Sequence, residues 1–357
     1  MTRTLTIVAS VAALFLAAGG GVVAQQRGGG AQAPKLEVEA LWPKPFPVAK
    51  HWILGSVTGV AVDGQDRIWV VHRGVDSLQN NEKGPTLEPW ASSCCFAAPQ
   101  ILAFDTTGNL VATWEVAANK GYEWPHDPSG IAVDKAGNVY VGSGLAPSSL
   151  PAGRGRGAAP APPPPGTVVL KFDKTGKYLS TIRDLDRPLA VAVDDTANEL
   201  YVADDGHGRI AVFDANSGTL KREWKANGQP FKTITCVAIA KDGMVYVCDR
   251  GNNRIQVFAK DGKFVKEAFV SKETKGDGSV WDVAFSPDQR QLYVADGHDK
   301  KVWILDRTSL DTVGSFGEGG RYPGQFYGVG SIAVDSKGNV YTGETYEGKR
   351  VQKFVKR

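Results

Sequence analysis

Apolar and polar residues alternate in short segments along most of the chain from residue 60 onward. Three or four alternating apolar residues are followed by a short polar turn, and the turn is followed by a second apolar segment. Alternation with a period of two residues on both sides of a turn is the pattern of a β-hairpin. This hairpin pattern occurs six times, starting at Val60, Ile131, Val191, Val237, Val283 and Ile332.

Two further alternating segments follow each of the first five hairpins. The six copies start 71, 60, 46, 46 and 49 residues apart. Four strands repeated at about this period are typical of propeller blades, which stack around an axis because one blade cannot bury both of its faces alone. We therefore predict an all-β, six-bladed β-propeller. A pair of β-sandwiches is the competing architecture, but a sandwich does not require six equal units.

The sixth copy lacks a fourth strand, because the chain ends soon after the segment VQKFV that starts at Val351. The unassigned segment Leu36–Trp42 can supply this strand by pairing with VQKFV. Such pairing would close the ring and protect both sheet edges. We therefore predict a ring closed by an N-terminal strand.

The first 24 residues have the pattern of a secretory signal peptide. Arg3 precedes an apolar stretch from Leu5 to Ala18, and small residues precede Gln25. A membrane anchor is the alternative, but the stretch is shorter than the roughly 20 residues that a span needs. We expect residues 25–35 to form a disordered linker and residues 36–357 to form the propeller. The protein is then exported, either periplasmic or secreted, with no membrane span after cleavage.

Two long spacings predict loop insertions at residues 75–100 and 144–166. The first insertion contains Cys94 and Cys95, and the second contains the tract GRGRGAAPAPPPPG, whose composition cannot build a core. We expect the second insertion to be a mobile, solvated loop.

Export allows the four cysteines to pair. If residues 241–243 form the turn of the fourth hairpin, Cys236 and Cys248 face each other across the two strands. We predict a disulfide between them, with two buried free thiols as the alternative. Cys94 and Cys95 are adjacent, so they either bond to each other or link elsewhere, and the pattern does not choose.

Composition limits the choice of partners. The net charge is +3, which is too small to draw the whole protein onto nucleic acid. Hydrophobic residues make up 42% and charged residues 22% of the chain, as in ordinary globular proteins. We expect a small-molecule or peptide ligand, with a protein partner as a further option, and no nucleic acid.

Residues at equivalent positions of the blades form rings around the axis, and loops at one end surround the mouth of the channel. After the second strand of each copy, one such ring contains Arg73, Asp205, Arg250 and Glu344. Converging charges in a concave site suggest binding. We predict these four residues as a binding site. A structural ring of ion pairs between blades is the alternative.

The histidines are few, and they do not form a known motif. His72, His207 and His298 follow second strands, and His126 precedes the second copy. None of them has the spacing of a metal-binding motif, and no hydrolase or nucleotide-binding motif is present.

The copies resemble NHL repeats, most clearly in VYVCDRGNNRIQVF (245–258), PSGIAVDKAGNVYV (128–141) and VDGQDRIWVVHRG (62–74). From Leu36 to the C-terminus, the order of elements resembles bacterial propellers related to peptidyl-α-hydroxyglycine α-amidating lyase. That lyase cleaves a peptidyl-α-hydroxyglycine into a peptide amide and glyoxylate. The resemblance implies a mouth zinc held by three histidines, with arginines and a tyrosine nearby.

Carried onto this sequence, the resemblance matches the arginines to Arg73 and Arg250, which are both present. The three zinc-ligand positions fall on residues that are poor zinc ligands. The loop that carries the family's tyrosine contains no tyrosine here, and it places His207 near the tyrosine's position. The family's acidic calcium ligand falls on a serine. We therefore expect no zinc held in the family's manner, and the calcium site loses its acidic residue too. The replaced metal positions are Ser129, Thr235, Gly330 and Ser331.

These observations favour a propeller that binds an anionic small molecule or peptide carboxylate at its mouth. The alternatives are an active carbon–nitrogen lyase of the peptidylamidoglycolate lyase type, or a structural, protein-interaction propeller. An active lyase would use a rebuilt metal site with His72, His126 or His207. The catalytic residues would then be Arg73, Arg250 and His207.

Overall fold

The computed structural model describes residues 33–116, 121–125, 127–144 and 167–357. The predicted signal peptide, most of the predicted linker, His126 and nearly all of the 144–166 insertion lie outside these ranges. Within them, no helix has the length and apolar character needed to cross a bilayer.

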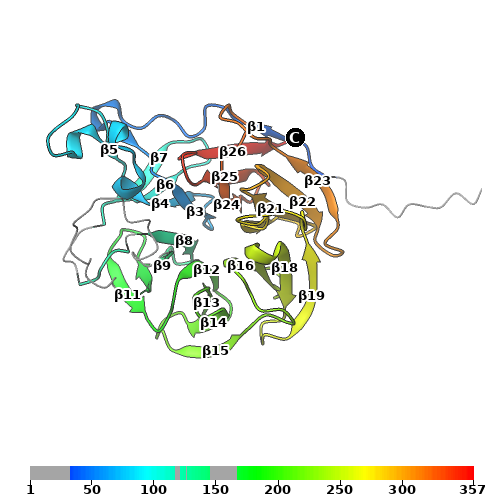
Figure 1. The fold of residues 1–357 in the computed structure, drawn as a ribbon. Helices are drawn as coiled ribbons and strands as arrows, with labels where there is room; N and C mark the ends of the chain where they lie inside the picture. The colour runs from blue at the N-terminus through cyan, green and yellow to red at the C-terminus, as the bar shows by residue number, and fades with distance from the viewer. Residues whose placement is uncertain (1–32, 117–120, 126, 145–166) are drawn as a thin grey trace, which may run out of the picture. The chain divides into compact units, whose positions relative to one another are not determined.

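Six four-stranded antiparallel sheets are arranged as the blades of a propeller in this part of the chain (Figure 1). The predicted all-β, six-bladed β-propeller is confirmed. In blades 1 to 5, successive strands run from the innermost to the outermost position. Blade 1 consists of β3 (Val57–Val62), β4 (Ile68–His72), β6 (Ile101–Phe104) and β7 (Leu110–Trp114). Blade 2 consists of β8 (Pro128–Val133), β9 (Val139–Ser143), β10 (Val169–Phe172) and β11 (Tyr178–Ile182). Blade 3 consists of β12 (Pro188–Asp194), β13 (Glu199–Asp204), β14 (Arg209–Asp214) and β15 (Leu220–Trp224).

The remaining blades follow the same plan. The innermost strands contact one another in ring order, from blade 1 round to blade 6 and back to blade 1. Blade 4 consists of β16 (Ile234–Ile239), β17 (Val245–Asp249), β18 (Arg254–Phe258) and β19 (Phe264–Phe269). Blade 5 consists of β20 (Asp282–Phe285), β21 (Gln291–Asp296), β22 (Lys301–Asp306) and β23 (Thr312–Phe316). Blade 6 consists of β24 (Val329–Val334), β25 (Val340–Glu344), β26 (Val351–Lys356) and β1 (Leu36–Val38).

Strand β1 closes the ring as its outermost strand in blade 6. Leu36 pairs with Lys356 and Val38 with Phe354. The strand ends at Val38 rather than at Trp42 as predicted, because the chain then turns and buries Trp42 between blades 6 and 1. There the Trp42 ring lies 5.0 Å from Tyr341 and 5.8 Å from Phe104. The N-terminal segment therefore joins the last blade to the first.

An acidic residue holds the turn between the first and second strands of several blades. In blade 6, Asp335 Oδ1 accepts hydrogen bonds from the backbone N–H groups of Lys337 and Asn339, at 3.0 and 2.8 Å. Asp335 Oδ2 accepts another from the Tyr341 hydroxyl at 3.0 Å. Gly338 has φ +87°, a left-handed conformation that glycine adopts without a Cβ clash. The repeated Asp, Gly, Asn and Tyr of the sequence are therefore a turn motif.

The aromatic residue of this motif recurs on the second strand of every blade. All six side chains are at most 1% exposed, and each packs in a hydrophobic cluster shared with the next blade. This burial supplies the apolar contact between neighbouring blades. The six residues are Trp69, Tyr140, Tyr201, Tyr246, Tyr293 and Tyr341.

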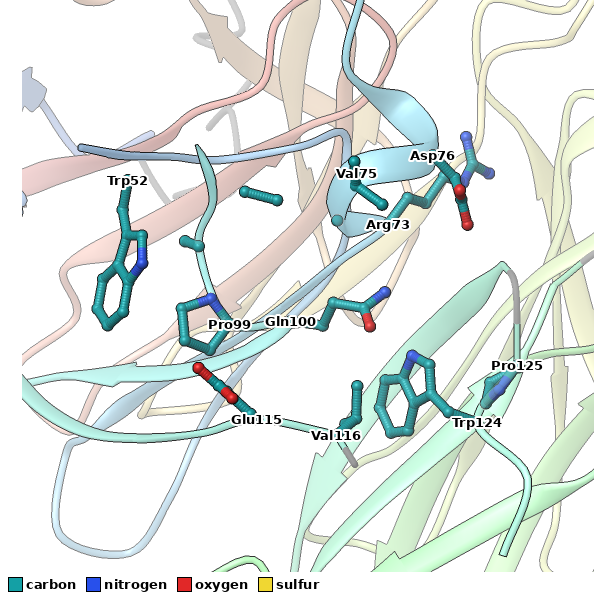
Figure 2. Close-up of a pocket in the computed structure, with 13 residues that line it drawn as sticks. Trp52, Arg73, Val75, Asp76, Pro99, Gln100, Glu115, Val116, Trp124 and Pro125 are labelled. Carbon is teal, nitrogen blue, oxygen red and sulfur yellow. The ribbon is translucent and has the colours of Figure 1, made fainter. Parts of the chain in front are cut away.

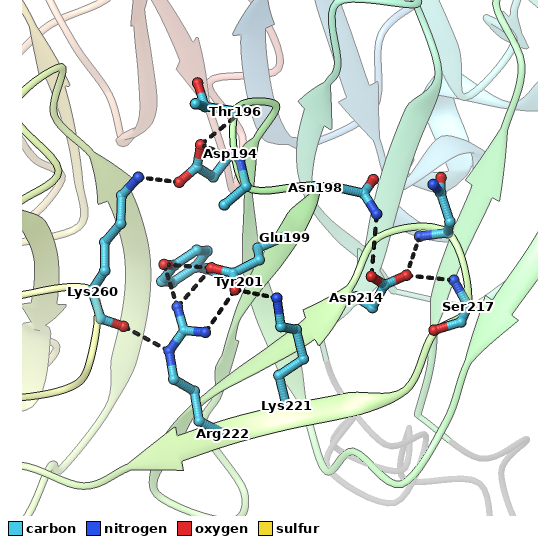
Figure 3. A network of polar contacts seen from close by, with 12 residues as sticks. Asp194, Thr196, Asn198, Glu199, Tyr201, Asp214, Ser217, Lys221, Arg222 and Lys260 are labelled. Carbon is cyan, nitrogen blue, oxygen red and sulfur yellow. Dashed lines mark hydrogen bonds and ion pairs between the residues drawn. The ribbon is translucent and has the colours of Figure 1, made fainter.

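Polar contacts add to the packing between blades 3 and 4 (Figure 3). Lys260 of blade 4 forms an ion pair with Asp194 of blade 3, and the Lys260 carbonyl accepts a hydrogen bond from Arg222 Nε at 2.7 Å. Arg222 also donates to both oxygens of Glu199, at 2.7 and 2.6 Å. These hydrogen bonds from Arg222 lower the pKa of Glu199 to about 2. The charged side chains of this network are paired with one another, so we interpret the network as structural.

The connection between β4 and β6 carries the predicted 75–100 insertion. Its short β5 (Phe96–Ala97) pairs in parallel with β2 (Trp52–Ile53), and Cys94 is bonded to Cys95. Cys236 faces Cys248 in the register of β16 and β17, and the two form a disulfide. The 3-10 turns of the described chain are η1 (Val48–Lys50), η2 (Gly74–Ser77), η3 (Asn80–Glu82), η4 (Gly84–Thr86) and η6 (Arg250–Asn252).

Removing residues 1–43 should lower the melting temperature of the protein markedly. The deletion takes away β1, exposes the edge of β26 and removes the buried Trp42, and loss of a buried tryptophan side chain alone costs about 3–5 kcal/mol. Differential scanning calorimetry measures the effect, with removal of residues 1–32 as the matched control. Equal melting temperatures for the two truncations would show that closure by β1 does not stabilise the ring.

Candidate functional site

A cavity of about 360 Å³ lies at the end of the propeller where the innermost strands begin. We call it the mouth cavity. All six blades contribute the residue that comes just before or at the start of the innermost strand, as expected for equivalent positions around an axis. These six residues are Thr58, Ser129, Leu189, Thr235, Trp281 and Gly330.

The hydroxyl groups of this ring bond to neighbouring blades. Thr58 Oγ1 donates to the Pro128 carbonyl at 2.6 Å, and Ser129 Oγ donates to the Leu189 carbonyl at 2.9 Å. Thr235 Oγ1 donates to the Val280 carbonyl at 3.2 Å. The ring hydroxyls therefore join blade to blade at the mouth.

This geometry tests the zinc that the resemblance implies. The three positions Ser129, Thr235 and Gly330 do come together around one cavity. However, two of them supply hydroxyl groups that already donate to carbonyl oxygens, and the third has no side chain. Zinc prefers imidazole, thiolate or carboxylate ligands, so these residues do not fit it. Ser331 offers one neutral, buried oxygen, where calcium takes six to eight oxygen ligands and usually carboxylates among them.

Arg73 lines the mouth cavity and forms an ion pair with Asp127. Arg73 Nε and Nη2 both donate to the carboxylate, with Nη2 at 3.3 Å from Oδ2, so one edge of the guanidinium is occupied. Burial raises the pKa of Asp127, although Arg73 opposes the rise.

Arg250 lines the same cavity without a comparable partner. It begins η6 directly after β17, and its guanidinium lies over the Trp281 ring, 4.5 Å from the ring centre. Its Nε is buried and has no hydrogen-bond partner, and no residue in the described ranges forms an ion pair with it. Burial lowers the pKa of Arg250, but a guanidinium keeps its charge at neutral pH. A charged donor group is thus left unsatisfied at the mouth.

The sequence reasoning missed Arg187, which also lines the mouth cavity. Arg187 directly precedes Pro188, the first residue of β12, and forms an ion pair with Asp205. Asp205, a predicted site residue, is buried, and its Oδ1 accepts a hydrogen bond from the Ile234 N–H at 2.7 Å. Asp205 itself does not line the mouth cavity, but it forms an ion pair with Arg187, which does. A charged residue two positions before the ring position Leu189 was the available signal.

Tyr346 is a second missed residue. It lies in the loop after β25 with φ +51°, and its ring meets the Trp281 ring edge-on at 5.9 Å. Its hydroxyl donates to Asp277 Oδ2 at 3.1 Å. Burial and the nearby Asp277 charge raise the pKa of Tyr346, so its hydroxyl stays protonated at neutral pH.

Glu344 and His207, two other predicted residues, do not line the mouth cavity. Glu344 is fully buried, forms an ion pair with Arg350, and accepts a hydrogen bond from the Tyr327 N–H at 2.6 Å. His207 is bonded through Nδ1 to Asp204 Oδ2 at 2.8 Å and is half-exposed outside the cavity. Glu344 is therefore a structural acid within blade 6.

Both ring nitrogens of His72, a residue that the rebuilt-site hypothesis names, are used in hydrogen bonds to the backbone. Its Nδ1 accepts hydrogen bonds from the N–H groups of Gly55 and Gly74, at 3.1 and 3.0 Å. Its Nε2 then carries the proton and donates to the Pro99 carbonyl at 3.0 Å. Burial lowers the pKa of His72 to about 4, so the ring is neutral. His126 lies outside the described residues, and among those described no three His, Cys, Asp or Glu side chains gather as a metal site would require.

A second cavity of about 420 Å³ lies beside the mouth cavity, and Arg73 lines both. We call it the side cavity. Figure 2 shows Trp52 and Trp124 on its two sides, with Pro99 and Gln100 between them. Its walls are largely apolar, so it can accept an apolar part of a ligand whose charged end lies in the mouth cavity.

A family model described as NHL repeat matches residues 231–258, which cover β16, β17 and β18. The chain is a six-bladed β-propeller with a match to the NHL repeat in its fourth blade. It is 23% identical over 330 residues to peptidyl-glycine alpha-amidating monooxygenase B of Xenopus laevis, covering 87% of this chain and 34% of the frog protein. It is 26% identical over 230 residues to NHL repeat-containing protein 3 of Homo sapiens, covering 62% of this chain and 61% of the human protein.

The chain thus spans about a third of the length of the frog enzyme and about three fifths of the human protein. A crystal structure of a Bacteroides thetaiotaomicron protein of unknown function matches with a TM-score of 0.55 and 15% identity, over 85% of this chain and 70% of that one. At that identity the match supports the propeller fold alone.

Stability should depend on pH through His72. Its pKa is about 4 in the folded protein against 6.5 for the free side chain, so protonation favours the unfolded state. The contribution of the neutral ring is complete above about pH 6.5 and is lost as the pH falls toward 4, by up to about 3 kcal/mol. Denaturant unfolding at pH 7 and pH 4.5 should show a smaller loss in His72→Gln than in the wild type. An equal loss in both proteins would contradict the assignment.

Proposed function

We propose that this propeller binds the carboxylate of a small molecule or peptide in its mouth cavity. The observation that carries the proposal is Arg250, a charged, half-buried guanidinium beside the cavity whose buried Nε–H is unsatisfied. Partial burial of a charge without a close counter-ion is unfavourable, and a bound carboxylate would supply that counter-ion. Arginine and carboxylate are also matched in shape, because two parallel N–H groups can bind two oxygens.

The surroundings of Arg250 favour an anion over a metal ion or a cation. The ring positions that would hold zinc supply only hydroxyls tied to backbone carbonyls and a glycine. Three arginines line the cavity. Arg73 is paired with Asp127 and Arg187 with Asp205, whereas Arg250 is attracted by Asp277 without an ion pair or hydrogen bond to it. Arg250 is therefore the arginine that lacks a close counter-ion.

The size and the neighbours of the cavity favour a small molecule or the end of a peptide. A cavity of about 360 Å³ accepts a ligand of modest size, and the side cavity shares the lining residue Arg73 with it. The frog relative is named for peptidyl-glycine, and a peptide that ends in glycine presents a free carboxylate. This similarity supports a peptide carboxylate as one candidate ligand.

An amidating-type lyase is the second candidate function, and the alignment with the frog enzyme over 330 residues is what favours it. It would need a metal site other than the ring positions and other than His72. A structural propeller that docks a protein partner is the remaining alternative.

We further propose that the protein acts outside the cytoplasm. The first 24 residues have the pattern of a signal peptide, and the structure contains disulfides Cys94–Cys95 and Cys236–Cys248. Disulfides persist in oxidising compartments, such as the periplasm or the extracellular space.

Arg250→Gln should weaken binding of N-acetylglycine by about 1.5–3 kcal/mol, because it removes a hydrogen bond between charged groups. Isothermal titration calorimetry measures the affinity. The uncharged probe N-acetylglycinamide should bind the wild type weakly or not at all. Arg290→Gln is the matched control, because Arg290 is exposed in the turn between β20 and β21, at the end of the innermost strand away from the mouth. Equal affinities of the wild type and Arg250→Gln would refute the proposal.

Purified, dialysed protein should contain no stoichiometric zinc and should not convert an α-hydroxyglycine peptide to its amide. The reason is that the three ring positions offer no suitable zinc ligand. Elemental analysis and product chromatography provide the two readouts. One zinc per chain together with turnover would favour the lyase and would point to ligands other than the ring positions.

A further inference from the structure

Arg187 and Arg250 form a pair of cationic groups in one cavity. Both line the mouth cavity, and both have a buried Nε that lacks a hydrogen-bond partner. Burial lowers the pKa of Arg250, Asp277 and Tyr346 oppose this, and the charge of Arg187 adds to the lowering, so the two guanidinium groups repel each other. Asp205 pairs with Arg187 and Asp277 attracts Arg250, but neither acid fills the buried Nε–H groups. An anion that contacts both arginines would also reduce their repulsion.

The chain holds Arg187 firmly at this place. Arg187 has φ +56°, a left-handed conformation that few arginines adopt. The Arg187 carbonyl accepts a hydrogen bond from the Asp205 N–H at 3.2 Å, and the Asp205 carboxylate pairs with the Arg187 side chain. Because Asp205 is also bonded to the Ile234 N–H of blade 4, the position of Arg187 is tied to two blades. The arginine is therefore preorganised at the mouth.

Arg187 has more free donors for a ligand than Arg73 has. Arg73 uses Nε and Nη2 together on Asp127, so one edge of its planar group is filled. Arg187 pairs with Asp205 through Nη2, and its Nε–H has no partner. Arg250 has no ion pair with any residue that the structure describes. Of the three mouth arginines, Arg187 and Arg250 are thus the two whose Nε is buried without a partner.

We propose that the ligand of the mouth cavity is a dicarboxylate, with one carboxylate on Arg250 and the second on Arg187. This inference rests on the proposed carboxylate-binding function and specifies its ligand class. A ligand with one carboxylate satisfies one guanidinium and leaves the other unsatisfied, whereas two carboxylates joined by a short linker satisfy both. A dicarboxylic acid, or a peptide that ends in an acidic residue, has this chemistry.

The test compares succinate with butyrate, which have the same chain length but two carboxylates and one. Calorimetry on the wild-type protein should show succinate binding at least about tenfold more tightly than butyrate, since each charge-assisted pair adds about this factor. Arg187→Gln should lose this preference, with a roughly tenfold weaker succinate affinity and little change for butyrate. Arg250→Gln should weaken both probes, and Arg290→Gln should change neither.

The substitution of Arg187 leaves Asp205 buried without its partner, so a second variant is needed. Arg187→Gln combined with Asp205→Asn removes both charges of the pair and should show the same loss of preference in a folded protein, checked by thermal melting. If the single variant does not fold, the double variant tests whether the preference for succinate depends on Arg187.

The remaining outcomes separate a failure of the dicarboxylate inference from a failure of the proposed carboxylate binding. If the wild type binds butyrate and succinate equally well, or if loss of Arg187 weakens both probes equally, the dicarboxylate inference is wrong while carboxylate binding stands. If inorganic phosphate binds as tightly as succinate and depends on both arginines, the site recognises total charge rather than two spaced carboxylates, which also overturns the inference. If the wild type binds neither carboxylate, the proposed function and this inference both fail.

Discussion

Each blade of this protein can bury its two faces only against its neighbours, and the ring must therefore close. Closure is made by the three residues of β1, which complete blade 6, and by Trp42, which packs between blade 6 and blade 1. The buried aromatic residue on every second strand then meets a neighbouring blade all the way around. Without closure, the first and last blades would each expose an apolar face and a sheet edge to water.

The same constraint creates the mouth cavity. Because the innermost strands are equivalent, the residues just before them meet around the axis, and most of their polar groups are used to join one blade to the next. The hydroxyls of Thr58, Ser129 and Thr235 all donate to carbonyl oxygens of the adjacent blade. Arg187 and Arg250 are exceptions, because the Nε of each is buried without a partner, and Arg250 also lacks an ion pair with any described residue. The chemistry of the mouth thus lies in the arginines, while the ring that could have held a metal is used for structure.

The fold could be predicted almost completely from the sequence, because the period-two alternation and the six-fold repeat report it directly. Arg73 and Arg250 could also be placed at the mouth, since they occupy equivalent positions after second strands. Glu344 has an equivalent position too, yet Arg350 and the Tyr327 N–H draw it into the interior of blade 6. Arg187 and Tyr346 could not be predicted in this way. Their side chains reach the mouth from left-handed loop residues, and strand periodicity says nothing about such loops.

The central claim is that the unsatisfied guanidinium of Arg250 is the site of a carboxylate. A crystal structure of the protein soaked with N-acetylglycine tests this most directly. The account predicts electron density for the carboxylate within hydrogen-bond distance of the Arg250 guanidinium, in the mouth cavity, and none in crystals of Arg250→Gln. A mouth cavity that holds only water in the soaked wild-type crystals, or a ligand that lies elsewhere on the propeller, would contradict it.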